Sequence, residues 1–98
     1  EAPELGGWYD EHAEEGLMVI TLLGENGAGQ SPSTDDLMDW ATSYGLNHPV
    51  VNDSGWGVTG RYVPESFGIP TQHLIGPGGE ILATDAFLSE DEVVANLP

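Results

Sequence analysis

The chain has no cysteine, so as given it can form no disulfide, no thiolate metal site and no thiol nucleophile. It is also nearly free of positive charge: one Lys or Arg stands against 17 Asp and Glu, for a formal net charge of −16. A single cation cannot neutralise a row of phosphates, which excludes nucleic-acid binding. The same charge argues against docking on anionic membranes, and no run approaches the ~18–20 apolar residues that span a bilayer.

The acidic residues that are present are spread along the whole sequence and interleaved with apolar ones. This pattern predicts a single folded domain over residues 1–98, because a disordered acidic segment would lack the apolar partners. Repulsion at −16 should destabilise the compact state at low salt. We therefore hypothesise a high-salt environment, and the alternative is an ordinary acidic secreted or periplasmic domain.

Apolar spacing and capping residues predict alternating helices and strands. In the first half of the chain we expect a helix at 2–15, a strand at 17–23 buried on both faces, a loop at 24–33, and a helix capped by Ser33 or Thr34 and ended by Gly45. A short strand at 48–51 and a short helix at 58–67 should follow. The chain should end with strands at 72–75 and 81–84, joined by a Gly-Pro-Gly-Gly turn, and a C-terminal helix capped by Ser89. This order predicts an α/β sandwich around one mixed sheet, with the hairpin as its antiparallel part.

Three stretches of the sequence carry a family resemblance. The first runs from Glu1-Ala2-Pro3 into the apolar segment ending at Ile20, and the second joins Tyr44-Gly45 to Pro49-Val50 and Asp53. The third places Gly68-Ile69-Pro70-Thr71 before an apolar strand, a glycine-containing turn and a second strand. In order and spacing they resemble the TlpA/ResA-like thiol–disulfide oxidoreductases of the thioredoxin-fold, or redoxin, group.

The resemblance implies a thioredoxin-like fold that lacks its N-terminal part. Family members usually read W-C-x-x-C-x-x-E-x-P, and Glu1-Ala2-Pro3 matches the end of that pattern. Both cysteines and the central strand before them would then precede Glu1, so the chain as given should be inactive. We expect the gap in the sheet to be filled by a rearranged sheet, a strand exchanged with a second copy, or residues preceding Glu1.

The resemblance also implies which residues form the site. Glu1 matches the auxiliary catalytic acid beside the cysteines, although an acid at a helix N-terminus can equally be structural. Pro70 matches the cis-proline loop, so Ile69, Pro70 and Thr71 would bind a substrate strand. Trp56 lies in a loop and would either line the same face or pack in the core.

Other motifs predict neither a metal nor a cofactor. His12, His48 and His73 have no ligand spacing, so no metal site is expected. Residues 55–60 match G-x-G-x-x-G, but Pro64 leaves no room for the crossover helix of a dinucleotide site.

Three functions follow as expectations. The first is electron transfer to protein disulfides by a thiol–disulfide oxidoreductase whose CxxC lies upstream of Glu1. The second is a peroxiredoxin-type peroxide reductase with one upstream cysteine. The third is a redox-dead module that binds a peptide or a second copy of itself through the Pro70 loop and open sheet edges. The expected partners are protein thiols and disulfides, and the family implies a periplasmic or extracellular location, often with a membrane tether.

Overall fold

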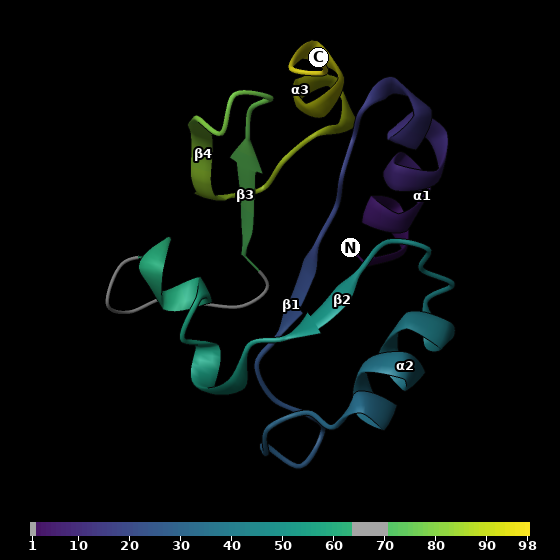
Figure 1. Ribbon diagram of the computed structural model, residues 1–98, viewed down its shortest axis with the longest axis vertical. Coiled ribbons are helices and arrows are strands. Elements are labelled where there is room, and N and C mark those ends of the chain that lie inside the picture. Colours follow the sequence, from purple (N-terminus) through teal and green to yellow (C-terminus); the bar gives the residue numbers. More distant parts are fainter. Residues whose placement is uncertain (1, 64–70) are drawn as a thin grey trace.

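The computed structural model describes residues 2–63 and 71–98, which form a mixed α/β arrangement of helices and two small sheets (Figure 1). The elements are α1 (Ala2–His12), η1 (Ala13–Glu15), β1 (Thr21–Leu23), α2 (Thr34–Ser43), β2 (Val50–Asn52), η2 (Ser54–Trp56), η3 (Thr59–Arg61), β3 (Gln72–Ile75), β4 (Ile81–Ala86) and α3 (Glu90–Ala95). The α/β class predicted from the sequence is therefore confirmed. The last four residues of the helix predicted at 58–67 lie outside the described residues, and within its described part, 58–63, only the short 3-10 turn η3 is helical.

The helix ends follow from the residues that cap them. Gly16 adopts φ 103° after η1, a left-handed conformation that favours glycine and ends the predicted 2–15 helix. Ser33 begins α2 with a reciprocal capping box: its Oγ accepts from the Asp36 N–H, and its own N–H donates to Asp36 Oδ2 at 2.8 Å. Ser89 and Glu92 form the same arrangement at α3. All three predicted boundaries are confirmed.

The strands form two separate pairs rather than the one mixed sheet that was predicted. β1 runs parallel to β2, with Thr21 opposite Val50 and Leu23 opposite Asn52. β3 and β4 form the expected antiparallel hairpin, with register shifts along it. Figure 1 shows the hairpin standing apart from the β1–β2 pair. No strand of residues 2–63 or 71–98 bonds to both pairs, which is the physical reason that they do not merge.

The apolar segment 17–23 is also less buried than predicted. Only Thr21–Leu23 joins the ladder, and Met18 and Ile20 are each 59% exposed. Within the described chain, the backbone groups of Met18, Val19 and Ile20 make no hydrogen bonds. A strand is buried on both faces only where neighbouring strands and covering layers enclose it. Among the described residues no strand pairs with 17–20, and the half-buried Leu17 and Val19 alternate with the exposed Met18 and Ile20.

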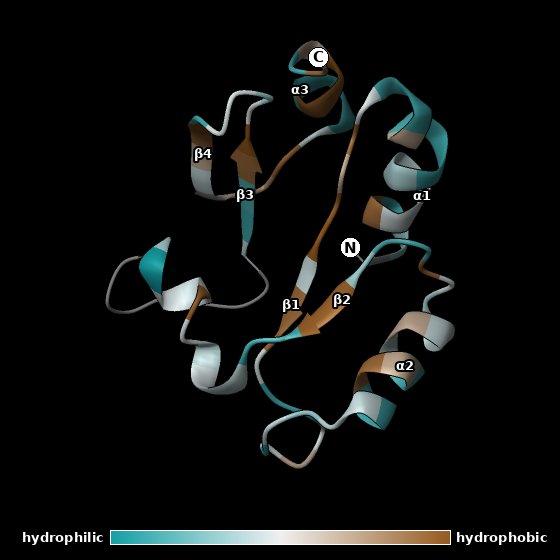
Figure 2. Ribbon diagram, viewed as in Figure 1, coloured by the Kyte–Doolittle hydropathy of each residue, from teal (hydrophilic) through white to brown (hydrophobic). Residues whose placement is uncertain are grey.

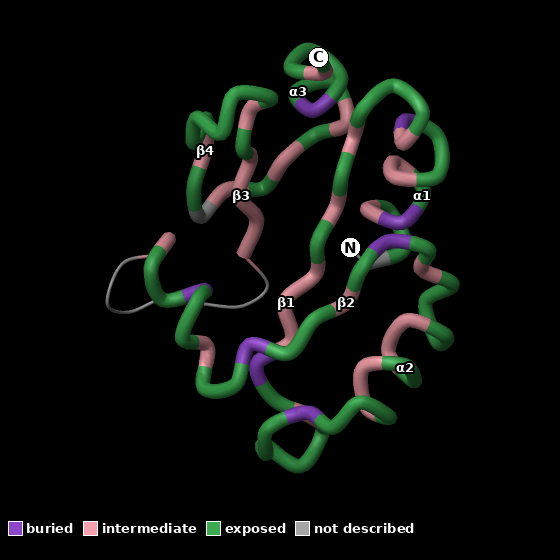
Figure 3. Tube along the Cα trace, in the orientation of Figure 1, coloured by how far each residue is buried: buried purple, intermediate pink, exposed green. Residues whose placement is uncertain are grey.

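The hydrophobic core of the described residues is thin. The one buried hydrophobic residue among those described is Val93 in α3, which is 5% exposed, and the accessible surface is 6188 Å². A compact monomer of this mass would expose about 5400 Å². Hydrophobic residues are concentrated on β1 and β2 (Figure 2). Most of the chain is nevertheless exposed or half-buried (Figure 3). The chain thus exposes more surface than a compact monomer of its mass, and large hydrophobic side chains such as Met18, Ile20 and Phe87 are among the exposed residues.

Candidate functional site

The residues implied by the family resemblance fall partly outside the description. Glu1, Ile69 and Pro70 lie outside the described residues, so neither their positions nor the proline isomer is tested. Thr71 is half-buried directly before β3, and Trp56 is half-buried at the end of η2. The structure therefore places two of the five predicted residues.

Trp56 is held in an uncommon backbone conformation by the loop around it. Its φ is 58°, a value that non-glycine residues rarely adopt. The loop is organised by the Asp53 carboxylate, 5% exposed, which accepts from the N–H groups of Val58 and Thr59 and from the Thr59 hydroxyl at 2.7–2.8 Å. Burial alone would raise the pKa of Asp53, but these three donors and the nearby Arg61 charge outweigh it and lower that pKa.

An open cleft of about 510 Å³ lies in front of Trp56. It is lined by Leu23, Glu25, Asn26, Gly27, Asp36, Asp39, Trp40, Ser43, Tyr44 and Trp56. The rings of Trp40 and Tyr44 are in contact, with centroids 4.8 Å apart and planes tilted by 57°. Aromatic walls with carboxylates among them suit a cationic or aromatic side chain of a ligand. Trp56 thus lines this cleft and also packs against Gly24, so its place as a substrate-binding residue stays a prediction.

Trp56 packs closely against Gly24, which directly follows β1. A substitution at Gly24 therefore tests how this wall of the cleft is packed. A Cβ at Gly24 would overlap the Trp56 indole. Gly24→Ala should therefore displace the indole and destabilise the chain by about 1–3 kcal/mol. Urea unfolding and tryptophan fluorescence measure the two effects. Gly27→Ala is the matched control, because Gly27 lines the same cleft and a Cβ there meets open space. Equal behaviour of the two variants would contradict the packing described.

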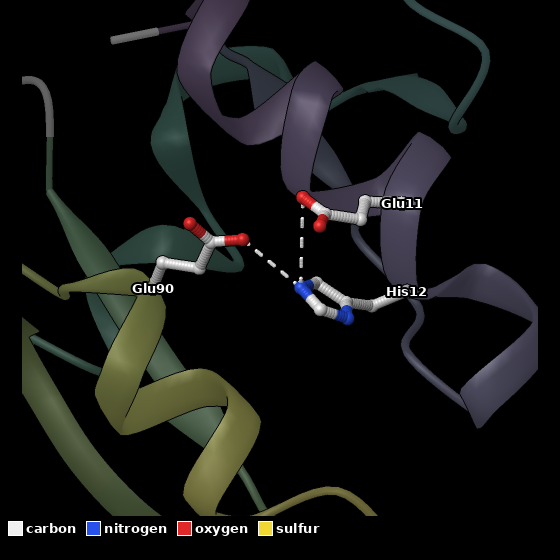
Figure 4. Close-up of side chains that lie close together, drawn as sticks. All are labelled: Glu11, His12 and Glu90. Atoms are coloured by element: carbon white, nitrogen blue, oxygen red, sulfur yellow. Dashed lines mark hydrogen bonds and ion pairs between the residues drawn. The ribbon is translucent and has the colours of Figure 1, made fainter.

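A second cluster joins α1 to α3 around the buried ring of His12 (Figure 4). The Nδ1 atom lies 2.8 Å from Glu15 Oε1, and the Nε2 atom lies 2.9 Å from Glu90 Oε2. Nε2 is also 3.9 Å from Glu11 Oε2. The hydrogen bond to Glu15, the one to Glu90 and the nearby Glu11 charge raise the pKa of His12 above its ordinary value, against an opposing effect of burial.

The sequence did not predict this cluster. His12 and Glu15 are three apart on one helical turn, so their pairing was readable from the sequence. Glu90 lies 78 residues further along the chain, and only the packing of α3 against α1 brings its carboxylate to His12. The spacing of histidines along the sequence reveals only ligands that are close in sequence, so this contact between distant segments could not be predicted from it.

His48 plays a different part, at the edge of the parallel pair. Its ring is 4% exposed, its Nε2 is 2.8 Å from Thr21 Oγ1, and Tyr9 meets it edge-on. Burial lowers the pKa of His48, with Asp10 opposing weakly. Neutral imidazole therefore suits this position, and its contacts tie α1 and β1 to the segment before β2.

Among the described helices, none has the length and apolar character that crossing a bilayer requires. Comparison with known proteins found no matching family model and no matching curated protein.

Proposed function

We propose that this chain is part of a thioredoxin-like thiol–disulfide oxidoreductase whose redox cysteines lie in a segment preceding Glu1. The observation that carries the proposal is the separation of the strands into a parallel pair and an antiparallel hairpin. In the family that the sequence resembles, one central strand joins two such pairs into a single mixed sheet. That strand immediately precedes the cysteines in the family. A single segment preceding Glu1 would therefore supply both the strand that joins the two pairs and the redox cysteines.

The unpaired backbone of residues 18–20, directly before β1, supports the same proposal. A strand added along Met18, Val19 and Ile20 would satisfy their free backbone groups. It would also cover Met18 and Ile20, which are 59% exposed, and burying such side chains contributes about 1.5–3 kcal/mol each. The completed sheet would enlarge a core that is too thin in the described chain.

The position of α1 supplies the chemical environment for the cysteines. α1 is described from Ala2, and a helix continued upstream from it would begin at a CxxC motif whose second cysteine lies three residues before Glu1. The helix dipole and free N–H groups lower the pKa of a thiol placed there. The thiolate would attack a substrate disulfide, and a second thiol would release the reduced substrate while the enzyme pair becomes a disulfide. Glu1 would act as the auxiliary acid, with Ile69, Pro70, Thr71 and Trp56 contacting the substrate.

Insulin-disulfide reduction on the protein expressed from the complete gene tests the proposal. With a dithiol donor, the full protein should reduce insulin, and serine at the first upstream cysteine should abolish the activity. Residues 1–98 alone should show none, since they contain no cysteine. A full protein with an upstream CxxC and no activity, or activity that survives the serine variant, would contradict it.

A second candidate function is binding through the open edge of β1. The exposed, unpaired segment Met18–Ile20 offers both backbone groups and apolar side chains to an added strand. A redox-dead module would use this edge for a peptide or a second copy. The two candidates are separated by the upstream sequence: the oxidoreductase requires cysteines there, and the binding module requires none. Protein thiols as partners and a periplasmic or extracellular location belong to the first candidate only.

A further inference from the structure

We propose that Glu11, His12 and Glu90 form a binding site for a divalent transition-metal ion, with Zn²⁺ as the probe, at the junction of α1 and α3. The three residues are brought together by the packing of the first and last helices (Figure 4). They offer one imidazole nitrogen and two carboxylate oxygens, and no assigned role of the chain uses them.

The distances between the donor atoms suit a small ion. His12 Nε2 lies 2.9 Å from Glu90 Oε2 and 3.9 Å from Glu11 Oε2. All three donor atoms lie within 4.8 Å of one another. Tetrahedral Zn²⁺ with bonds of about 2.0–2.2 Å holds its ligand atoms about 3.4 Å apart. The distance from Nε2 to Glu90 Oε2 is below this value, and the distance to Glu11 Oε2 is above it. Small rotations of the two solvent-accessible glutamate side chains can bring both oxygens to the distance that the ion requires.

Glu15 provides the support that a metal-binding histidine usually has. Its Oε1 lies 2.8 Å from His12 Nδ1, and an ionised Glu15 can only accept, so Nδ1–H would donate to Glu15 and leave Nε2 as the atom that binds an ion. Metal-ligating histidines commonly donate their second ring N–H to a carboxylate, which fixes the tautomer and raises the basicity of the ligand. This contact distinguishes the cluster from a simple surface patch of acids.

The short contact between His12 Nε2 and Glu90 Oε2 needs a hydrogen or a metal ion between the two atoms. The His12 ring is buried, and a bare nitrogen lone pair 2.9 Å from a carboxylate oxygen would be repelled by it. Either a proton or a metal ion satisfies both atoms. The net charge of −16 raises the local concentration of cations around the chain. The imidazole nitrogen favours Zn²⁺ over Mg²⁺ or Ca²⁺, which prefer oxygen donors. Three protein ligands would leave a coordination position open to water or another ligand.

Isothermal titration of the 98-residue chain with Zn²⁺ tests the site. The titration is made at about pH 8, where free imidazole is mostly neutral, and in about 1 M NaCl to screen diffuse binding. We expect one Zn²⁺ per chain. Glu90→Gln and His12→Gln should each weaken this binding by about 100-fold or more, and Glu15→Gln by about 10–100-fold.

Two matched controls separate the site from the general acidity of the chain. Glu14→Gln and Asp91→Asn remove the same charge from exposed neighbours in η1 and α3, and both should bind Zn²⁺ like the parent chain. Circular dichroism confirms folding of each variant, and Glu90→Gln decides the question if His12→Gln fails to fold.

Nuclear magnetic resonance of the histidine ring nitrogens gives an independent readout. Zn²⁺ should shift the Nε2 resonance of His12 while Nδ1 stays protonated. The proposal is overturned if Glu90→Gln binds Zn²⁺ as tightly as Glu14→Gln, if Zn²⁺ shifts His48 or His73 instead, or if no stoichiometric binding occurs. Equal affinity for Mg²⁺ would also overturn it, because diffuse attraction by carboxylates would then explain the binding.

Discussion

Replacing Asp53 by alanine is expected to destabilise the chain by about 3 kcal/mol. The Asp53 carboxylate is buried and accepts hydrogen bonds from Val58 N–H, Thr59 N–H and the Thr59 hydroxyl. Alanine would leave these three donors without their acceptor, and buried donors without partners are costly. The loss would also release the turn that holds Trp56 at positive φ, so the wall of the cleft should loosen as well.

Urea unfolding of Asp53→Ala measures this effect, with Asp35→Ala as the control. Asp35 is exposed in the first turn of α2, so its removal should change the free energy of unfolding by about 1 kcal/mol or less. A free energy of unfolding for Asp53→Ala equal to that of Asp35→Ala would show that the Asp53 turn does not stabilise the fold.

Because the pKa of Asp53 is lowered in the folded chain, its contribution to stability depends on pH. Its folded pKa lies below the value of 3.8 of an unperturbed carboxyl, so the stabilisation is complete above that pH. It is lost as the pH falls from the unfolded value through the folded one, because the unfolded chain then binds the proton first. The difference in stability between the parent chain and Asp53→Asn should therefore shrink as the pH falls below about 4. A difference that stays constant through this range would contradict the hydrogen-bonded carboxylate described.

Added salt is expected to raise the melting temperature of the chain by about 15 °C between ~0.1 and ~1 M NaCl. The net charge is −16, and the folded chain holds it within a radius of gyration of 13.6 Å. An unfolded chain of this length spreads the same charge over about 30 Å. Shortening the screening length from ~10 to ~3 Å removes repulsion mainly from the folded state, by on the order of 3 kcal/mol.

Calorimetry in a series of NaCl concentrations checks this expectation. A variant with Glu14, Glu25 and Glu80 changed to glutamine is the control, because these residues are exposed and their carboxylates make no hydrogen bond to a described residue. Its melting temperature should depend less steeply on salt. A melting temperature of the parent chain that stays level with salt would contradict the high-salt hypothesis and favour an ordinary acidic domain.

Local sequence signals predicted α1, α2, α3 and the β3–β4 hairpin well, but not the helix at 58–67, whose described part forms only η3. Ser33 and Ser89 each carry an acid three residues later, and a capping box depends on nothing outside that turn. Gly16 ends its helix for an equally local reason. The turn at residues 76–79 determined the hairpin in the same way.

Long-range features could not be read from the sequence. The apolar run before Thr21 predicted a fully buried strand, but burial depends on neighbours that the described chain does not supply to Met18 or Ile20. The contact of His12 with Glu90 depends on the docking of two helices at opposite ends of the chain. The role of Asp53 was missed because a buried aspartate and a solvated one look alike in a sequence, and only the three converging donors distinguish them.

The most direct test of the proposed function is the coding sequence upstream of Glu1, read together with the intact mass of the natural protein. The proposal predicts a mature protein heavier than these 98 residues, in which a strand-forming segment and a W-C-x-x-C motif precede Glu1, with the second cysteine three residues before it. A single T-x-x-C would instead indicate a peroxide reductase. A mature protein with no cysteine upstream of Glu1 would contradict both enzyme functions and leave binding through the open edge of β1.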